Sequence, residues 1–142
     1  MAIRFSSQNG NFELDLCQRF SAWIEEVVEM RGKRVGNINY LFCTDDYLIE
    51  INRKFLNHDT YTDIITFDSV VGNLVSGDIM ISTDRVGENA EHLGVTFEQE
   101  LSRVVIHGVL HLLGQGDKSD DEALQMRKLE DEALAVLDAT SK

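Results

Sequence analysis

The sequence predicts one domain, spanning residues 1–142, in which helices cover a four-stranded sheet, an α/β or α+β layer fold. The length of 142 residues is close to the most common size of a single domain. No shift in composition, low-complexity tract or internal repeat divides the chain. Stretches with a two-residue apolar period alternate with stretches of helical period, and helices accumulate towards the end of the sequence.

The first third of the chain predicts a strand, a helix and a second strand. Residues 2–7 alternate in character, which is typical of a short strand. Apolar residues recur three and four apart from 12 to 30, and this spacing predicts an amphipathic helix that ends at Gly32. The segment NINYLFCT (37–44) alternates again and predicts a strand. The apolar stripe of the helix contains Leu16, Phe20, Trp23, Ile24, Val27 and Val28.

The middle of the chain predicts a helix followed by two strands. The helix is expected to start after Thr44, because threonine is a good N-cap and two aspartates follow it in the first turn. Two strands, DIITFD (63–68) and SGDIMIST (76–83), are joined by the turn-like segment VVGN. The buried stripe of the helix is expected to contain Tyr47, Leu48, Ile51 and Phe55.

The rest of the sequence predicts three helices. A short helix covers 84–94, and a longer one runs over about 96–113. Thr96 and Gln99 can form a capping box at the start of the longer helix, and Gly114 is expected to end it. The last helix is expected from about 120 to 137, with Leu124, Leu129, Leu134 and Leu137 on its apolar side.

The charge of the chain limits the classes of partner. A net charge of −12, from 25 acidic and 13 basic residues, argues against a protein that coats nucleic acid nonspecifically. No segment approaches the roughly 20 apolar residues of a membrane span, and the N-terminal residues lack the apolar core of a secretory signal. We therefore expect a cytoplasmic protein without a membrane partner. Cys17 and Cys43 lie in apolar contexts and are interpreted as core residues.

Two histidines in HGVLHLLGQGD (107–117) indicate a metal site. His107 and His111 are four residues apart on a predicted helix, so their imidazoles share one face and can bind one metal ion. A third ligand is needed, and Asp117 follows just beyond a glycine-rich break, with Asp120 and Asp121 as fallback candidates. Such a set suits zinc and also fits iron or nickel. The alternative is a pair of hydrogen-bonded histidines on a packed helix.

Three ordered motifs carry a resemblance to a known family. HGVLHLLG (107–114), followed by Met126 and Glu130, resembles the signature H-G-x-L-H-L-x-G-x-D-H and the later M-x-x-x-E of the YbeY family of metal-dependent endoribonucleases. INRKFLNHDTYTDIITF (51–67) and GDIMIS (77–82) are similar to two upstream segments of the same family. The resemblance extends, in order, over nearly the whole chain.

The resemblance implies both a fold and an activity. The fold would be an α+β domain with a small mixed sheet, and one Zn²⁺ ion per chain would bind at the end of the histidine-bearing helix. The activity would be single-strand-specific cleavage of ribosomal RNA, in maturation of the 3′ end of the small-subunit RNA and in ribosome quality control. The implied partners are ribosomal RNA and the small ribosomal subunit, with no DNA expected.

The sequence departs from the family pattern at two positions. Asp117 stands where the family has its third histidine ligand, so the expected metal ligands here are His107, His111 and Asp117. Leu56 stands where the family usually has an arginine that faces the phosphate, and a leucine cannot stabilise negative charge in a transition state. Leu56 therefore leaves catalysis in need of another cationic side chain.

Two residues are candidate catalytic replacements. Arg103 lies one turn before His107, so its guanidinium can point towards the metal cleft, although an ion pair with Glu98 or Glu100 is an alternative. His58 lies two residues from Leu56 and can carry a proton, although a role in a turn is an alternative.

The predicted mechanism is metal-assisted hydrolysis of a phosphodiester. Thr62 and Asp63 are polar residues near the expected site, but starting the third strand is the favoured interpretation for both, and no residue stands out as a general base. One rival is a ribosome-assembly binding factor whose metal is mainly structural. A zinc peptidase is another, but Gly108 occupies the position of the glutamate that serves as base in H-E-x-x-H enzymes.

Overall fold

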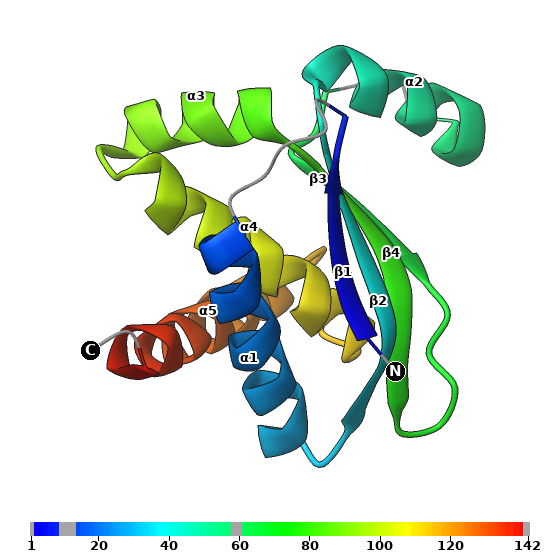
Figure 1. Ribbon diagram of the computed structural model, residues 1–142. Helices are drawn as coiled ribbons and strands as arrows, with labels where there is room; N and C mark the ends of the chain where they lie inside the picture. The colour runs from blue at the N-terminus through cyan, green and yellow to red at the C-terminus, as the bar shows by residue number, and fades with distance from the viewer. Residues whose placement is uncertain (1, 9–13, 58–60, 141–142) are drawn as a thin grey trace.

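The computed structural model describes residues 2–8, 14–57 and 61–140 (Figure 1). Its sheet has the strand order β1–β2–β4–β3. The first three strands in that order run parallel, and β3 pairs antiparallel with β4 at one edge. The predicted small mixed four-stranded sheet is thus confirmed. The strands are β1 (Ala2–Ser7), β2 (Arg34–Cys43), β3 (Ile64–Asp68) and β4 (Leu74–Ser82).

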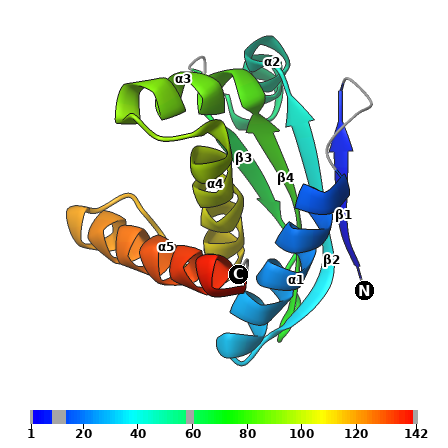
Figure 2. The ribbon, with the colours of Figure 1, turned by 60° about the vertical axis from the view of Figure 1, so that its left-hand side comes forward.

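Helices lie on both faces of the sheet, but unequally. The main core lies where α1 and α4 pack on one face, and α5 packs on the outer side of α4 (Figure 2). The opposite face carries a smaller cluster of Cys43, Leu48 and Ile65, which α2 covers. The domain is therefore α+β. The helices of the described residues are α1 (Leu14–Met30), α2 (Asp45–Leu56), α3 (Thr83–Leu93), α4 (Phe97–Leu112) and α5 (Asp120–Thr140).

The expected buried stripe of α2 is only half right. Leu48 is buried and Ile51 packs partly against the small cluster, but Tyr47 is 36% exposed and Phe55 is 59% exposed. Asn52 is buried instead. The reason is that α2 contacts only one end of the sheet, so a narrow strip of the helix finds apolar partners.

The expected position of Leu124 in the apolar side of α5 is wrong, because this residue is 71% exposed. The first turns of α5 project beyond α4, so a side chain there has no core to enter (Figure 2). Further along the helix, Met126, Leu129 and Leu137 are buried. The core contact of α5 thus starts near its second turn.

Helix α4 is the element that positions the site. Thr96 and Gln99 form the predicted capping box, each side chain accepting the other residue's backbone N–H. At Gly108, a β-carbon would lie 3.0 Å from the terminal methyl carbons of Ile64 and Ile79. Glycine therefore lets α4 lie directly on β3 and β4. The histidine-bearing end of the helix is held against the sheet edge as a result.

Within the described residues, no helix is both long enough and apolar enough to cross a membrane.

Candidate metal centre

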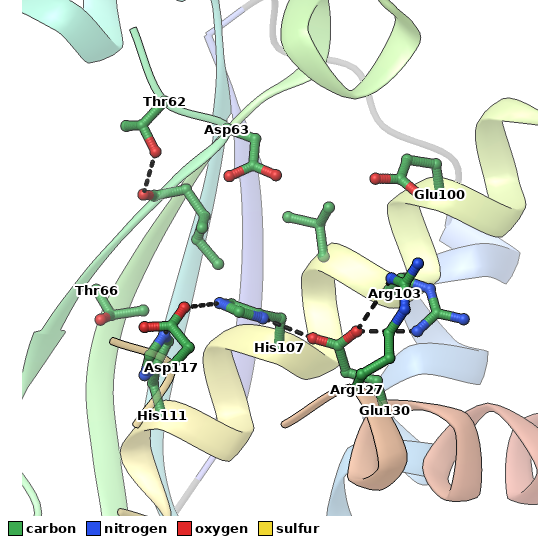
Figure 3. A pocket seen from close by; sticks show the side chains of 12 residues that line it. Thr62, Asp63, Thr66, Glu100, Arg103, His107, His111, Asp117, Arg127 and Glu130 are labelled. Atoms are coloured by element: carbon green, nitrogen blue, oxygen red, sulfur yellow. Dashed lines mark hydrogen bonds and ion pairs between the residues drawn. The ribbon is translucent and has the colours of Figure 1, made fainter. Parts of the chain in front are cut away.

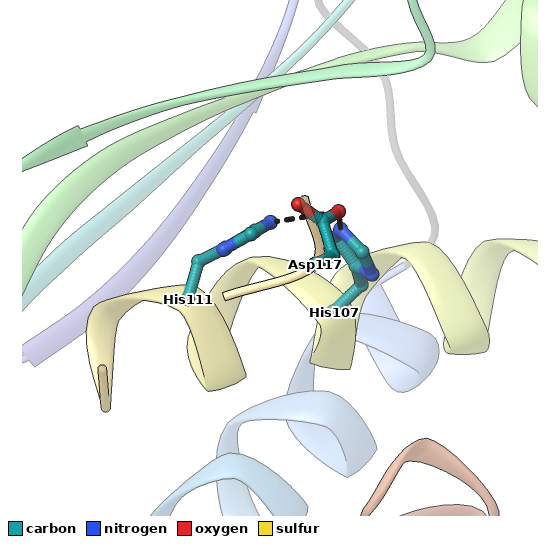
Figure 4. Close-up of side chains that lie close together, drawn as sticks. All are labelled: His107, His111 and Asp117. Carbon is teal, nitrogen blue, oxygen red and sulfur yellow. Dashed lines mark ion pairs between the residues drawn. The ribbon is translucent and has the colours of Figure 1, made fainter. Parts of the chain in front are cut away.

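The two histidines and Asp117 meet at the C-terminal end of α4. The rings of His107 and His111 lie 4.6 Å apart, edge to face. Asp117 Oδ2 lies 3.4 Å from His107 Nε2 and 3.4 Å from His111 Nε2. In the part of the chain that the structure describes, these three residues form the group whose metal-ligating atoms gather within 4.8 Å of one another (Figure 4).

His107 Nε2, His111 Nε2 and Asp117 Oδ2 form a triangle of possible metal donors, called the donor triangle below, and its dimensions fit a divalent transition metal. Ligands held at about 2.0–2.1 Å from a tetrahedral ion lie roughly 3.3–3.4 Å from one another. The two nitrogen-to-oxygen separations of 3.4 Å match that spacing. Two imidazoles and one carboxylate suit Zn²⁺ and leave a fourth position open for water or substrate. The same donors also bind nickel or iron.

The loop after α4 returns Asp117 to the helix end. Gly114 has φ +99°, a left-handed conformation that turns the chain. Its N–H donates to the His111 carbonyl, and the Gln115 N–H donates to the Leu110 carbonyl. The Gln115 side chain donates to Gly116 O and to Glu122 O at the start of α5. These bonds hold the loop folded back over the histidines.

Glu130 of α5 orients the first histidine. Its Oε2 lies 2.6 Å from His107 Nδ1, and its Oε1 accepts from Arg103 Nη1 at 2.9 Å. Glu130 is only 4% exposed. A carboxylate at Nδ1 fixes that nitrogen as the donor, so Nε2 faces Asp117 with its lone pair available. Glu130 matches a family motif, but its role could not be predicted from the sequence, because its contact with His107 depends on how α5 packs on α4.

The charges of this group support one another. Burial lowers the pKa of His107, but the hydrogen bond and negative charge of Glu130 outweigh burial and raise it. Burial raises the pKa of Glu130, but hydrogen bonds from His107 and Arg103 outweigh burial and lower it. The raised pKa of His107 and the lowered pKa of Glu130 both show that the charged forms of the two groups stabilise each other. A metal ion at Nε2 would supply such charge in place of a proton.

A polar pocket of about 420 Å³ opens beside the histidines (Figure 3). Its walls come from the start of β3, from one face of α4 and from α5. Burial raises the pKa of Asp63, although the charge of His107 opposes this. Burial and the charge of Asp63 also raise the pKa of Glu100. Besides the histidines and Asp117, the polar lining residues include Thr62, Asp63, Glu100, Arg103, Arg127 and Glu130.

Arg103, Leu56 and His58 are the other positions that the sequence singled out near the site. Arg103 lines the pocket, but its guanidinium pairs with Glu130 at 2.9 Å and Asp131 at 2.8 Å, and not with Glu98 or Glu100. Leu56 is 40% exposed and does not line the pocket. His58 lies outside the described residues. The catalytic roles of Arg103 and His58 therefore stay predictions.

Asp63 lies at the start of β3, as the favoured interpretation has it, and it also reaches the pocket. Its main-chain carbonyl does accept from Ser82 N at the start of β3, as a strand-starting residue would. Its side chain, however, lies in the pocket (Figure 3). Thr62 donates to the carbonyl of Ile64, which is a structural role. Asp78, in contrast, accepts from Asn39 on the sheet away from the site.

Two histidines and a carboxylate at the mouth of a polar pocket, on an α+β scaffold, define a class of protein with a candidate metal centre suited to hydrolysis. Comparison with known proteins gives the particular family. The family model described as Endoribonuclease YbeY matches residues 4–138, and the chain belongs to this family.

Curated relatives agree with the family match. The Endoribonuclease YbeY of Flavobacterium johnsoniae is 52% identical over 125 residues, which are 88% of this chain and 90% of the relative. That of Bacteroides thetaiotaomicron is 49% identical over 136 residues, 96% of this chain and 99% of the relative. The solution structure of TM1509 from Thermotoga maritima superposes with a TM-score of 0.67 at 30% identity, covering 97% of this chain and 93% of that one. The resemblance drawn from the motifs is thus confirmed.

Proposed function

We propose that this protein is a metal-dependent endoribonuclease that cuts single-stranded ribosomal RNA. The proposed roles are maturation of the 3′ end of the small-subunit RNA and ribosome quality control. The observation that carries the proposal is the donor triangle of His107, His111 and Asp117, oriented by Glu130 and open to a polar pocket. Membership of a family whose relatives are named Endoribonuclease YbeY supports RNA as the substrate.

His107, His111 and Asp117 would hold one Zn²⁺ ion, with nickel or iron as alternatives. A bound divalent ion would supply Lewis-acid polarisation of phosphate oxygens and neutralise their charge. Glu130 keeps the His107 ring in one orientation, and the half-exposed Asp117 leaves the centre accessible from solvent. Side chains of the protein would thus orient a metal ion at one side of the pocket, where a phosphodiester could bind it.

Arg103 is proposed to stabilise negative charge on the substrate phosphate. A guanidinium has five N–H donors, and the ion pairs with Glu130 and Asp131 engage one terminal nitrogen each. These pairs hold the group in the pocket wall, where further N–H groups remain to donate. His58 is proposed to carry a proton, as the sequence suggests. Both proposals follow from the family pattern, in which an arginine stands where this chain has Leu56.

The Arg103 proposal is tested by Arg103→Ala, with Lys128→Ala on the exposed side of α5 as the control. We expect at least a tenfold loss of RNA cleavage, because removal of one donor to a transition-state anion costs about that much or more. The loss of activity should exceed the loss of thermal stability, since Glu130, which is buried, keeps its hydrogen bond to His107 when Arg103 is removed. Equal losses of activity and stability, or full activity, would remove Arg103 from the mechanism.

Ribosomal RNA and the small ribosomal subunit are the proposed partners, and the cytoplasm is the proposed location. The net charge of −12 disfavours a general electrostatic attraction to nucleic acid, so it supports a substrate that is bound locally at the metal centre. No interaction with DNA or membranes is expected.

The function is tested by incubating purified protein with single-stranded RNA from the 3′ end of small-subunit ribosomal RNA. We expect cleavage that stops with a chelator and returns with added zinc, nickel or iron. His111→Ala should abolish it, whereas His92→Ala, at the exposed end of α3, should not. Cleavage that persists after complete metal removal would defeat the proposal.

A ribosome-assembly binding factor is the second candidate, and the leucine at position 56, where the family has an arginine, favours it. Ribosome association that is unchanged in His111→Ala, without turnover in the wild type, would support this role. A zinc peptidase is disfavoured further, because Gly108 packs on Ile64 and Ile79 where no glutamate side chain has room.

A further inference from the structure

Two carboxyl groups of the pocket are left unused by the proposed metal centre. Glu100 lies on α4, seven residues before His107, and therefore projects from the same face of the helix. Asp63 lies opposite, at the start of β3. Figure 3 shows both carboxyl groups facing the open space of the pocket, away from His111 and Asp117.

Glu100 is buried without a partner for its charge. The residue is 7% exposed and lines the pocket, and no hydrogen bond or ion pair of its carboxyl group is found among residues 2–8, 14–57 and 61–140. Its oxygens open onto the pocket, because Arg85 Nε is the side-chain atom of these residues that is both fully buried and unpartnered. Burying an unpaired carboxylate costs free energy, and like charge from Asp63 adds to that cost, as the raised pKa of Glu100 indicates. Arg103 and Arg127 offset part of it at longer range. A ligand that donates hydrogen bonds would relieve the rest.

The chemistry of the pair points to a donor ligand. Two carboxyl groups repel a phosphate, so the phosphate of a substrate belongs at the histidine end of the pocket. The pair also lacks a third protein ligand for a cation. Among the described residues, the group of three possible metal ligands is His107, His111 and Asp117, which does not include Asp63 or Glu100. The volume of about 420 Å³ lies within the range of pockets that bury a small organic ligand. The donor groups of RNA are base N–H groups and the ribose 2′-hydroxyl.

We propose that Asp63 and Glu100 form a subsite that accepts hydrogen bonds from the nucleoside part of an RNA nucleotide whose phosphate lies at the metal centre. The subsite rests on the proposed function and adds a specificity to it. Nucleotides that present adjacent N–H donors, as guanine does on its pairing edge, or a 2′-hydroxyl, are bound in preference to donor-poor ones.

The test measures binding to zinc-loaded protein by calorimetry, so it does not depend on cleavage. The probes are guanosine 5′-monophosphate, its inosine and 2′-deoxy counterparts, ribose 5-phosphate and inorganic phosphate. We expect guanosine monophosphate to bind at least tenfold more tightly than inorganic phosphate. Weaker binding of the inosine form assigns the base amino group as the donor, and weaker binding of the 2′-deoxy form assigns the ribose hydroxyl.

Glu100→Gln and Asp63→Asn should each reduce guanosine monophosphate affinity about tenfold, the size of a lost hydrogen bond to a charged group. Affinity for inorganic phosphate should not fall, because each substitution removes a negative charge that repels phosphate. Glu91→Gln, exposed on α3, is the matched control. Asp63→Asn keeps the test valid if Glu100→Gln does not fold.

Two results would overturn the subsite: equal affinity of the wild type for all the probes, or variants that bind guanosine monophosphate as the wild type does. A second Mn²⁺ ion, detected by electron paramagnetic resonance and lost in Glu100→Gln, would also overturn it in favour of a cation. Cleavage of RNA without these preferences refutes the subsite alone. Preferential binding without cleavage refutes the proposed function alone.

Discussion

At the scale of single residues, Glu130 shows that the geometry of the candidate metal centre depends on a residue that is not one of the proposed ligands. Its two carboxylate oxygens contact His107 at 2.6 Å and Arg103 at 2.9 Å. A ligating histidine whose second nitrogen is held in this way loses less rotational freedom on binding a metal, and its basicity increases. The geometry of the site thus depends on a residue ten positions into another helix.

Glu130→Gln should weaken zinc binding about 10- to 100-fold, which is the usual effect of removing a carboxylate behind a ligating histidine. The amide keeps the size of the side chain but loses its charge. Zinc affinity is measured by competition with a chromophoric chelator, and Glu132→Gln, exposed on the same helix, serves as the control. An unchanged zinc affinity would show that Glu130 only joins α5 to α4.

Glu100 gives a prediction on pH. Its folded-state pKa is raised by burial and by Asp63, so the native state binds this proton more tightly than the unfolded chain does. Its unfavourable contribution to stability is absent below the unfolded pKa, grows as pH rises from the unfolded to the folded pKa, and is complete above the folded pKa. Glu100→Gln removes the contribution, so the melting temperature of the variant relative to the wild type should increase between pH 4 and pH 7. Thermal melts of metal-free protein at both pH values measure this, and a constant difference would contradict it.

At the scale of helices and strands, periodicity and capping predicted the order of elements well. Each predicted strand and helix has a counterpart, because two-residue and helical periods are properties of neighbouring residues. The errors at Tyr47, Phe55 and Leu124 share one cause. Periodicity predicts which side of a helix is apolar, but the extent of the surface that covers it is set by distant elements.

The candidate site likewise divides into features set by neighbouring residues and features set by the packing of distant elements. His107, His111 and Asp117 could be predicted, since all three lie within one helix and its following loop. The contact between Glu130 and His107, and the shared pocket of Asp63 and Glu100, could not, because they depend on the packing of α5 and β3 against α4.

The capping box of α4 leads to a prediction for the element that carries the histidines. Thr96→Ala removes the side chain that accepts the Gln99 N–H, and such a loss costs about 1 kcal/mol. The melting temperature should fall by roughly 3–5 °C, whereas zinc affinity should not change because the cap lies three turns from His107. Ser69→Ala, an exposed hydroxyl outside the helices, is the control for the same thermal melt. A variant as stable as the wild type would mean that tertiary packing alone holds the start of α4.

At the scale of the whole molecule, the metal should act as a stabilising ligand. It would bind residues from α4 and the following loop, and Glu130 would link it to α5, so the unfolded chain cannot reproduce the site. Zinc at about 100 times its dissociation constant would add about 2.7 kcal/mol, or roughly 5–10 °C in melting temperature. Thermal melts with and without zinc measure the shift, and His111→Ala should lose it. A wild type that melts at one temperature regardless of zinc, nickel or iron would contradict the metal centre.

The contribution of α5 to the histidine site has a consequence during synthesis of the protein. The ribosome makes the two histidines and Asp117 before it makes Glu130, so a nascent chain has the proposed metal ligands before the residue that orients His107. Until the final helix docks, no carboxylate holds Nδ1 of His107, so the proposed centre is expected to bind metal more weakly. An incomplete chain that ends before Glu130 is therefore expected to retain less metal than the finished protein.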